Sequence, residues 1–303
     1  MVDLSVDLGF LKLKNPVMAA SGTFGYGLEF QPLYNLNLLG GLVVKGLYFK
    51  PREGNPPPRL AESPCGLINS IGLQGIGVEA FCREILPWLA DLTTAVIANV
   101  CGEEEGEYAR VAEYLSRHPG LAALELNISC PNVREGGKCP AQDPEATYRT
   151  VKRVRQASSL PLITKLSPNV TDITAVALAA QEAGSQAVSL VNTFLALAID
   201  LESRKPKLGN VLGGLSGPAI KPLAMRMVFE VARKVKIPVI GLGGIFNYQD
   251  ALEFMVAGAS AVQVGTANFV NPQACPEIIK GIEDWAESQG IKRLSEIVGS
   301  LKF

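Results

Sequence analysis

Short runs of aliphatic and β-branched residues alternate along the chain with longer stretches of helical period. Eight runs have the length and composition of buried strands: PVMAAS (16–21), GLVVKG (41–46), AVIANV (95–100), ALELNIS (123–129), LITKLS (162–167), AVSLVN (187–192), PVIGLGG (238–244) and AVQVGT (261–266). Apolar residues spaced three and four apart predict helices over 78–90, 104–117, 143–157, 172–183, 218–235, 248–257 and 274–288. Only the gap between the first two strands is poorly helical.

This alternation predicts an α/β fold. Continuously apolar strands are typical of a parallel sheet covered by helices on both faces, and eight strand–helix units favour closure into a (β/α)8 TIM barrel. A doubly wound open sheet is the alternative. The alternating start, VDLSVDLGFLKLKN, predicts an N-terminal β-hairpin that plugs the bottom of the barrel, and 46–77 is a long Pro- and Gly-rich loop inserted at the C-terminal mouth. We expect residues 1–303 to form one domain.

The composition excludes several classes of function. With 28 Lys and Arg against 29 Asp and Glu, and no polybasic run, we expect neither nucleic acid nor a membrane surface as a partner. The N-terminus lacks a signal-like apolar stretch, so a cytoplasmic location is predicted. The six cysteines form no CxxC pair, and the single histidine lies at a predicted helix end. No metal site is expected.

Polar residues and glycines follow the predicted strands. Catalytic residues of such barrels lie at the C-terminal ends of the strands. These ends carry Ser21 and Gly22, Lys45, Asn99, Asn127 with Cys130, Lys165, Asn192 and Thr193, Gly243 and Gly244, and Gly265 and Thr266.

Each of these residue types has a structural and a functional interpretation. The glycine pairs form turns or expose backbone N–H groups to a phosphate, and eight consistent strand ends favour the phosphate. The two lysines are surface residues, or they hold an anion between them. A desolvated lysine also suits a Schiff-base aldolase, which remains an alternative. A lone asparagine is a turn former, but the set Asn69, Asn99, Asn127, Asn132 and Asn192 matches a ring with alternating C=O and N–H groups, such as a pyrimidine or a flavin.

Cys130 is a candidate general base. A lone cysteine is most often a small buried hydrophobic residue. However, the other strand ends carry no histidine or carboxylate. The Cys130 thiol, which has an ordinary pKa of about 8.5, is therefore the proton acceptor among the strand-end residues.

Long motifs resemble one family. The segments NPPPRLAESPCGLINSIGLQ, LELNISCPNV, ITKLSPNVTDI, LSGPAIKPLAMRMVFEVA and GASAVQVGTANF together resemble the dihydroorotate dehydrogenases, over about residues 4–285. The likeness is greatest to the catalytic subunit of the NAD-linked, two-subunit class. The membrane-bound class carries an N-terminal anchor and a serine at the position of Cys130. Gly46, Gly75 and Ala196 depart from residues that are common in the family.

The resemblance implies FMN-dependent oxidation of dihydroorotate to orotate in pyrimidine biosynthesis, with Cys130, Lys45 and Lys165 as catalytic residues. The implied FMN-binding residues are Ala20, Ser21, Gly22, Lys45, Gly46, Asn99, Asn127, Lys165, Val191, Gly217, Gly243, Gly244, Gly265 and Thr266. The implied substrate-binding residues are Lys45, Asn69, Ser70, Ile71, Gly72, Leu73, Asn127, Asn192 and Thr193.

The resemblance also implies a partner. No GxGxxG motif opens a helix within a βαβ unit, so the chain alone is not expected to use NAD. The implied partner is a separate subunit bearing FAD and a [2Fe–2S] cluster, bound to a homodimer of this chain to give a heterotetramer. The alternative within the family is the single-subunit, fumarate-dependent enzyme.

Overall fold

The computed structural model describes residues 2–129 and 140–303. All eight predicted strands form one closed parallel barrel, which confirms the (β/α)8 fold and excludes the open sheet. The strands are β3 (Val17–Ala19), β4 (Gly41–Val43), β7 (Ala95–Val100), β8 (Ala123–Asn127), β9 (Leu162–Lys165), β10 (Ala187–Leu190), β15 (Val239–Leu242) and β16 (Ala261–Val264). β16 pairs with β3, so the last strand closes onto the first.

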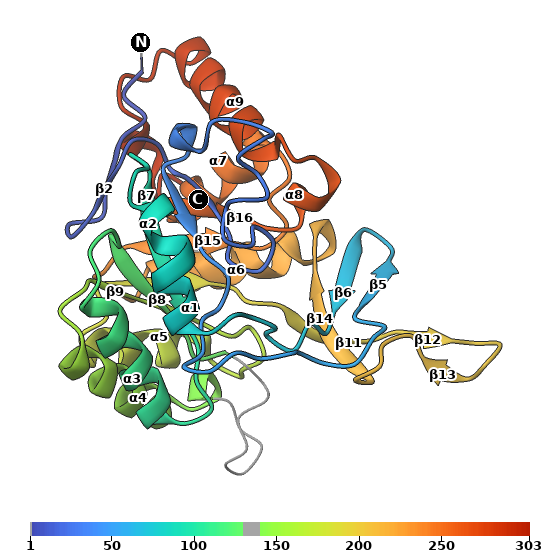
Figure 1. Cartoon of the computed structure of the whole chain (residues 1–303). Coiled ribbons are helices and arrows are strands. Elements are labelled where there is room, and N and C mark those ends of the chain that lie inside the picture. The colour runs from blue at the N-terminus through green and yellow to red at the C-terminus, as the bar shows by residue number, and fades with distance from the viewer. Residues whose placement is uncertain (1, 130–139) are drawn as a thin grey trace.

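Helices surround the barrel (Figure 1). The first helical segment runs through α1 (Val78–Ala80), the π-helical turn η2 (Phe81–Ile85) and α2 (Leu86–Leu89). The others are α3 (Glu105–Ser116), α4 (Pro144–Ala157), α5 (Ile173–Glu182), α6 (Lys221–Ala232), α7 (Tyr248–Ala257), the short α8 (Ala267–Val270) and α9 (Ala274–Ser288). Single 3-10 turns occur at η1 (Leu36–Leu38), η3 (Pro140–Gln142), η4 (Pro218–Ile220) and η5 (Leu294–Ile297). All seven predicted helices are present.

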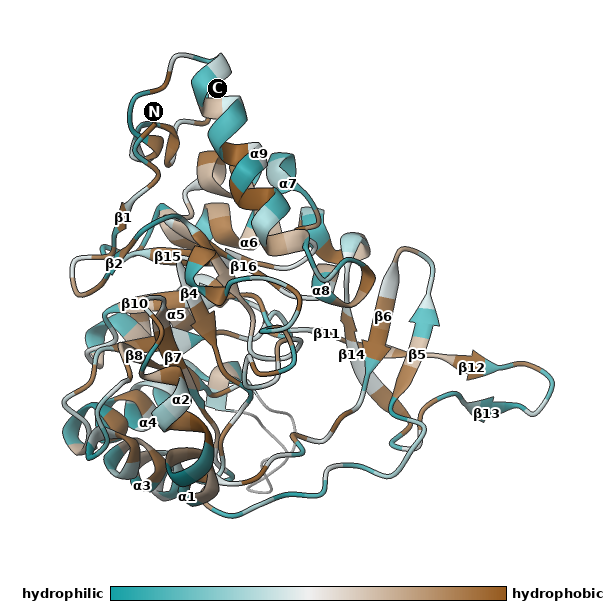
Figure 2. Ribbon diagram, turned by 45° about the horizontal axis from the view of Figure 1, so that its top comes forward, coloured by the Kyte–Doolittle hydropathy of each residue, from teal (hydrophilic) through white to brown (hydrophobic). Residues whose placement is uncertain are grey.

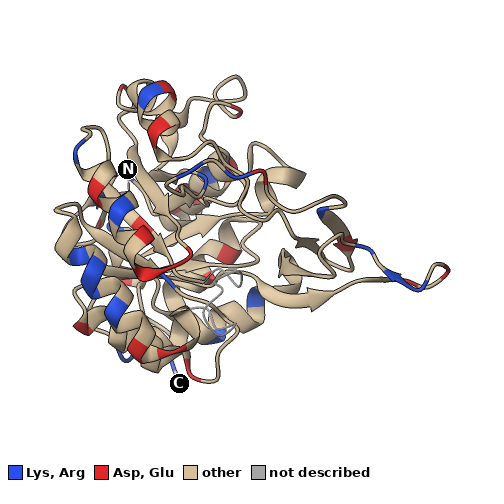
Figure 3. Ribbon diagram, turned by 60° about the horizontal axis from the view of Figure 1, so that its bottom comes forward, with Lys and Arg blue, Asp and Glu red and all other residues tan. Residues whose placement is uncertain are grey.

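Local sequence sets where these helices begin. Asp172 accepts hydrogen bonds from the backbone N–H groups of Thr174 and Ala175 at the start of α5. A capping box formed by Asn247 and Asp250 begins α7, and Gly258, with a φ of 124°, ends it. Figure 2 shows the apolar residues concentrated on the barrel strands, and Figure 3 shows charged residues mainly on the outer helices.

The N-terminal hairpin, β1 (Val6–Asp7) with β2 (Lys12–Leu13), closes the bottom of the barrel, as predicted. Leu8 and Leu13 are 2% exposed and pack against Met18, Ile97 and other residues near the N-terminal ends of the barrel strands. The bottom is therefore sealed by aliphatic side chains, and the opposite end is left for function.

The inserted segments were only partly predicted. The loop over 46–77 contains β5 (Leu60–Ser63) and β6 (Gly66–Asn69), which join β11 (Phe194–Leu197) and β14 (Leu212–Ser216) in an antiparallel sheet of order β11-β14-β6-β5. A further hairpin of β12 (Ile199–Asp200) and β13 (Lys205–Pro206) projects beside it (Figure 1). These strands have two to five residues each, and β6 pairs with β14 far away in the sequence, so periodicity alone did not reveal them.

Among the described residues, no helix combines the length and the apolar character that crossing a bilayer requires.

Candidate active site

A deep cavity opens at the C-terminal ends of the barrel strands. Its walls include residues from all eight strand ends and from β5, β6 and β14 of the inserted sheet. Every residue predicted to bind the cofactor lines it, namely Ala20, Ser21, Gly22, Lys45, Gly46, Asn99, Asn127, Lys165, Val191, Gly217, Gly243, Gly244, Gly265 and Thr266. The structure thus brings these residues together, and their individual roles stay predictions.

A second cavity adjoins the first one. Asn69, Ile71, Leu73, Asn127, Asn192 and Thr193 line both cavities. Ser70 and Gly72 line only the second cavity, and Lys45 lines only the first. The two cavities share these six residues and therefore form one composite site.

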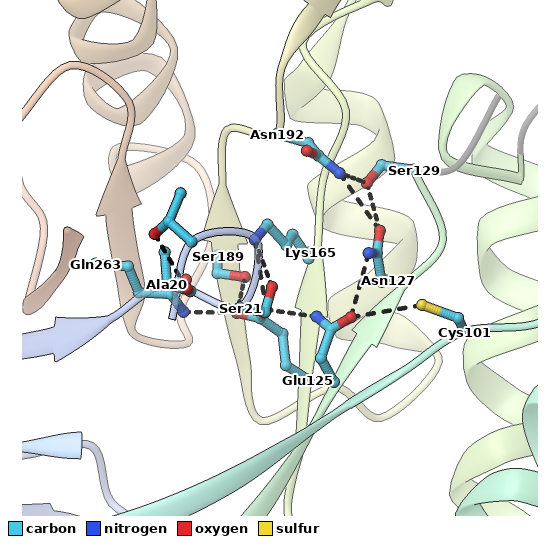
Figure 4. A network of polar contacts seen from close by, with 12 residues as sticks. Ala20, Ser21, Cys101, Glu125, Asn127, Ser129, Lys165, Ser189, Asn192 and Gln263 are labelled. Atoms are coloured by element: carbon cyan, nitrogen blue, oxygen red, sulfur yellow. Dashed lines mark hydrogen bonds and ion pairs between the residues drawn. The ribbon is translucent and has the colours of Figure 1, made fainter. Parts of the chain in front are cut away.

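The floor of the first cavity is a buried polar network that the sequence reasoning missed (Figure 4). Glu125 on β8 is completely buried and accepts hydrogen bonds from Asn99 Nδ2 at 2.8 Å, Ser189 Oγ at 2.9 Å and Gln263 Nε2 at 2.5 Å. Lys165 Nζ lies 3.5 Å from Glu125 Oε1 and 3.5 Å from Ser21 Oγ. A buried carboxylate is costly unless it is paired, and here four groups from four different strands compensate it.

This network adds a carboxylate to the predicted site. The sequence prediction covered only the last residues of the strands, whereas Glu125 lies two residues before Asn127 and points to the same side of its strand, into the barrel. Lys165, one of the two lysines predicted to hold an anion between them, pairs with a carboxylate of the protein itself. A polar residue in the middle of a buried strand, as in ALELN and AVQVG, was the available signal.

A chain of amides continues from the floor to the second cavity. Asn127 Nδ2 donates to Asn99 Oδ1 at 3.2 Å, and Ser129 Oγ donates to Asn127 Oδ1 at 2.8 Å. Asn192 Nδ2 donates to Ser129 Oγ. The carboxamides are thereby held in fixed orientations, as recognition of a ring with several polar groups requires.

Lys45 is the other cation of the site. Its side chain is half-buried, and burial lowers the pKa of its ammonium group, a shift that the nearby Glu29 carboxylate partly opposes and Arg59 reinforces. Because no carboxylate is within ion-pair distance of Lys45 among the described residues, it is suited to bind an anionic group of a ligand.

Glycines shape the end of the cavity after β15. A Cβ on Gly244, whose φ is +78°, would lie 2.8 Å from the backbone nitrogen of Lys221, so only glycine fits there. At the other side, a Cβ on Gly22 would meet no atom within 4 Å, so Gly22 borders open space. Thr266 Oγ1 donates to Ser216 Oγ at 2.8 Å and ties the loop after β16 to β14.

Two predicted residues, Cys130 and Asn132, lie outside the described residues. Of the described cysteines, Cys82, Cys101 and Cys275 are buried and Cys65 is exposed.

The fold and the site together define a (β/α)8-barrel enzyme with a composite pocket at the C-terminal ends of its barrel strands. The family model described as dihydroorotate dehydrogenase matches residues 3–285, and the chain belongs to that family. The resemblance inferred from the motifs is therefore confirmed.

Individual relatives are similar over the whole chain. The chain is 53% identical to the dihydroorotate dehydrogenase B (NAD(+)) catalytic subunit of Pelobacter propionicus and 54% identical to that of Thermodesulfovibrio yellowstonii, in both cases over 99% of each chain. The crystal structure of the dihydroorotate dehydrogenase of Eimeria tenella in complex with ferulenol matches with a TM-score of 0.81 at 21% identity. It covers 98% of this chain and 88% of that chain, and supports the fold.

Proposed function

We propose that this chain is the catalytic subunit of an NAD-linked dihydroorotate dehydrogenase, and that it oxidises dihydroorotate to orotate in the biosynthesis of pyrimidines. The observation that carries this proposal is the identity of more than half of the residues, over 99% of both chains, to catalytic subunits of that name. The single-subunit, fumarate-dependent class and the Schiff-base aldolase have no comparable support.

The family is flavin-dependent, and we propose FMN as the flavin of this chain. The residues of the first cavity fit that cofactor. Gly22 leaves space for a planar ring, a buried amide oxygen of Gln263 has no partner among the described residues, and glycines expose the backbone after β15 and β16. When bound, the flavin would accept hydride from the substrate.

The lysines would supply two different positive charges. Lys165, fixed by Glu125 at the floor, would stabilise negative charge that develops on the cofactor. Lys45, half-buried and facing the cavity, would bind the carboxylate of dihydroorotate. Asn69, Asn127 and Asn192, with Thr193, would orient the pyrimidine ring through their amide and hydroxyl groups.

Cys130 would remove the proton from the carbon next to the one that loses hydride. This role rests on the family resemblance and on the position of Cys130 directly after Ser129, which lines the second cavity. The thiolate is the reactive form, so the rate should fall as the pH drops below the pKa of this thiol.

The relatives are named catalytic subunits, which implies a partner subunit. We propose that this partner carries FAD and a [2Fe–2S] cluster and passes electrons to NAD, and that it binds a homodimer of this chain. We also propose that residues 1–303 act as one domain, because β3 and β16, from the two ends of the sequence, pair directly.

The test is anaerobic addition of dihydroorotate to the purified, yellow protein. We expect rapid bleaching of the flavin, and Cys130→Ala should bind FMN normally yet bleach at least about a thousandfold more slowly. Cys82→Ala is the matched control, because burial raises the pKa of Cys82 to about 11 and this residue lines neither cavity. A colourless protein, or normal bleaching in Cys130→Ala, would contradict the proposal.

A further inference from the structure

Gln263 on β16 presents a buried acceptor that none of the described residues satisfies. Its side chain is fully buried and belongs to the wall of the first cavity. The amide nitrogen Nε2 donates to Glu125, but the oxygen Oε1 has no hydrogen-bond partner among the described residues (Figure 4). An unsatisfied buried acceptor costs about 1–3 kcal/mol, so this oxygen points to a ligand.

The orientation of this amide is set by its neighbours. Glu125 is surrounded by donors, since Asn99, Ser189 and the Lys165 ammonium group all contact its two oxygens. A carboxylate held in this way accepts hydrogen bonds, and therefore the nitrogen of Gln263, and not its oxygen, must face Glu125. Glu125 thereby fixes the amide so that its oxygen is left for a donor in the cavity.

The flavin offers a matching donor. The pyrimidine edge of an oxidised isoalloxazine carries two carbonyl groups with one N–H group, N3–H, between them. We propose that Gln263 Oε1 accepts a hydrogen bond from flavin N3–H, and that Glu125 acts as the positioning residue that holds Gln263 for this contact. This assignment rests on the proposed function.

The position of Gln263 favours the ring over the phosphate tail. Its side chain reaches Glu125 in the middle of the barrel, next to Lys165, whereas the backbone of Gly265 and Thr266 lies beyond the end of the same strand. A hydroxyl of the ribityl chain is the competing donor, and it can be distinguished by changing N3 alone.

The experiment compares two ligands of the flavin-free protein, FMN and 3-methyl-FMN, which lacks the N3 proton. Quenching of flavin fluorescence gives both dissociation constants. We expect the wild type to bind FMN at least about tenfold more tightly than 3-methyl-FMN. In Gln263→Met, the ratio of the two dissociation constants should fall to about one.

Ser185→Ala is the matched control. Ser185 is a buried serine that contacts Thr164 and the backbone, not Glu125 or the cavity, so its loss should leave the preference for FMN at the wild-type value. An unchanged preference in Gln263→Met would overturn the assignment and leave the ribityl chain or a water molecule as the donor. A protein that binds no flavin would overturn both this assignment and the proposed function.

A measurement on the wild type keeps the test independent of the folding of the variant. FMN labelled with ¹⁵N at N3 should show, when bound, an N3 proton protected from exchange and shifted downfield by its hydrogen bond. An N3 proton that exchanges as fast as in free FMN would overturn the assignment.

Discussion

Glu125 and Lys165 form the most deeply buried ion pair among the described residues, with exposed side-chain fractions of 0% and 5%. Such a buried pair is tolerated only while both charges are present. Removing one partner leaves a charge that the protein interior cannot solvate, and it typically costs about 3–5 kcal/mol. The same pair holds the Lys165 ammonium group at a fixed place on the floor of the first cavity.

We therefore predict that Glu125→Gln lowers the free energy of unfolding by about 3–5 kcal/mol, because the Lys165 ammonium group loses its counter-charge. Urea unfolding followed by circular dichroism measures this change. Glu113→Gln is the control. It removes an exposed pair with Arg117 and should cost less than about 1 kcal/mol. Equal losses in both variants would mean that burial of the pair is not the cause.

The depressed pKa of Lys45 predicts a pH dependence of ligand binding. The ammonium form binds the anion, so orotate affinity should fall as the pH rises, beginning below the ordinary lysine pKa of 10.5. Titrations of orotate from about pH 7 to pH 10 measure this effect. Lys45→Arg stays charged over that range and should flatten the profile. A profile that is equally steep in the arginine variant would assign the titration to another group.

At the scale of elements, the inserted sheet carries part of the active site. β6 pairs with β14, and Asn69 on β6 lines both cavities while its amide nitrogen donates to Gly214 O at 3.2 Å. The sheet places Asn69 and Leu67 above the barrel mouth. The position of these cavity-lining residues therefore depends on strand pairing outside the barrel.

This dependence can be tested at Gly213 on β14. A Cβ there would lie 2.5 Å from Leu208 Cδ1 and 2.7 Å from the backbone oxygen of Asn69. We predict that Gly213→Ala shifts β14 against β6 and weakens orotate binding by about tenfold or more, while FMN remains bound.

Gly106→Ala on α3 is the matched control. Its added methyl group meets only the flexible side-chain ends of Arg153, at 3.4 Å, and Glu104, at 3.7 Å, and the helix gains up to about 1 kcal/mol from alanine. Orotate binding should not change in this variant. Full orotate affinity in Gly213→Ala would show that the sheet adapts and does not position Asn69.

At the scale of the whole molecule, electrons that enter the flavin need a route out. No cluster of three or more metal-ligating side chains occurs in residues 2–129 and 140–303, so an iron–sulfur route is not found within that part of the chain. The partner subunit implied by the names of the relatives would provide the route.

We predict that the isolated chain is reduced by dihydroorotate but transfers electrons to NAD only when the partner subunit is added. Anaerobic bleaching measures the first step, and formation of NADH, followed by its absorbance, measures the second. Adding the partner should raise NADH formation at least about a hundredfold. Efficient NAD reduction by the isolated chain would contradict the need for a partner, and efficient fumarate reduction would place the chain in the single-subunit class.

The sequence by itself determined the barrel fold and most of the residues that line the cavity at its mouth. Strands and helices follow from apolar periodicity, which is local, and in a parallel barrel all strand ends meet at one mouth. Residues as distant as Ser21 and Thr266 were therefore expected to line one cavity, and they do. The long family motifs added the chemistry of the cofactor and the substrate.

Only the tertiary structure decided which distant residues contact one another. The contact between Glu125 and Gln263 joins residues 138 positions apart, and that between Asn69 and Gly214 joins residues 145 apart. Neither residue of such a pair carries a local signal for its partner, because burial, register and the direction of a side chain inside a closed barrel arise only when all strands are in place. For this reason the sequence revealed the rim of the site, whereas its charged floor and its inserted sheet emerged only from the folded chain.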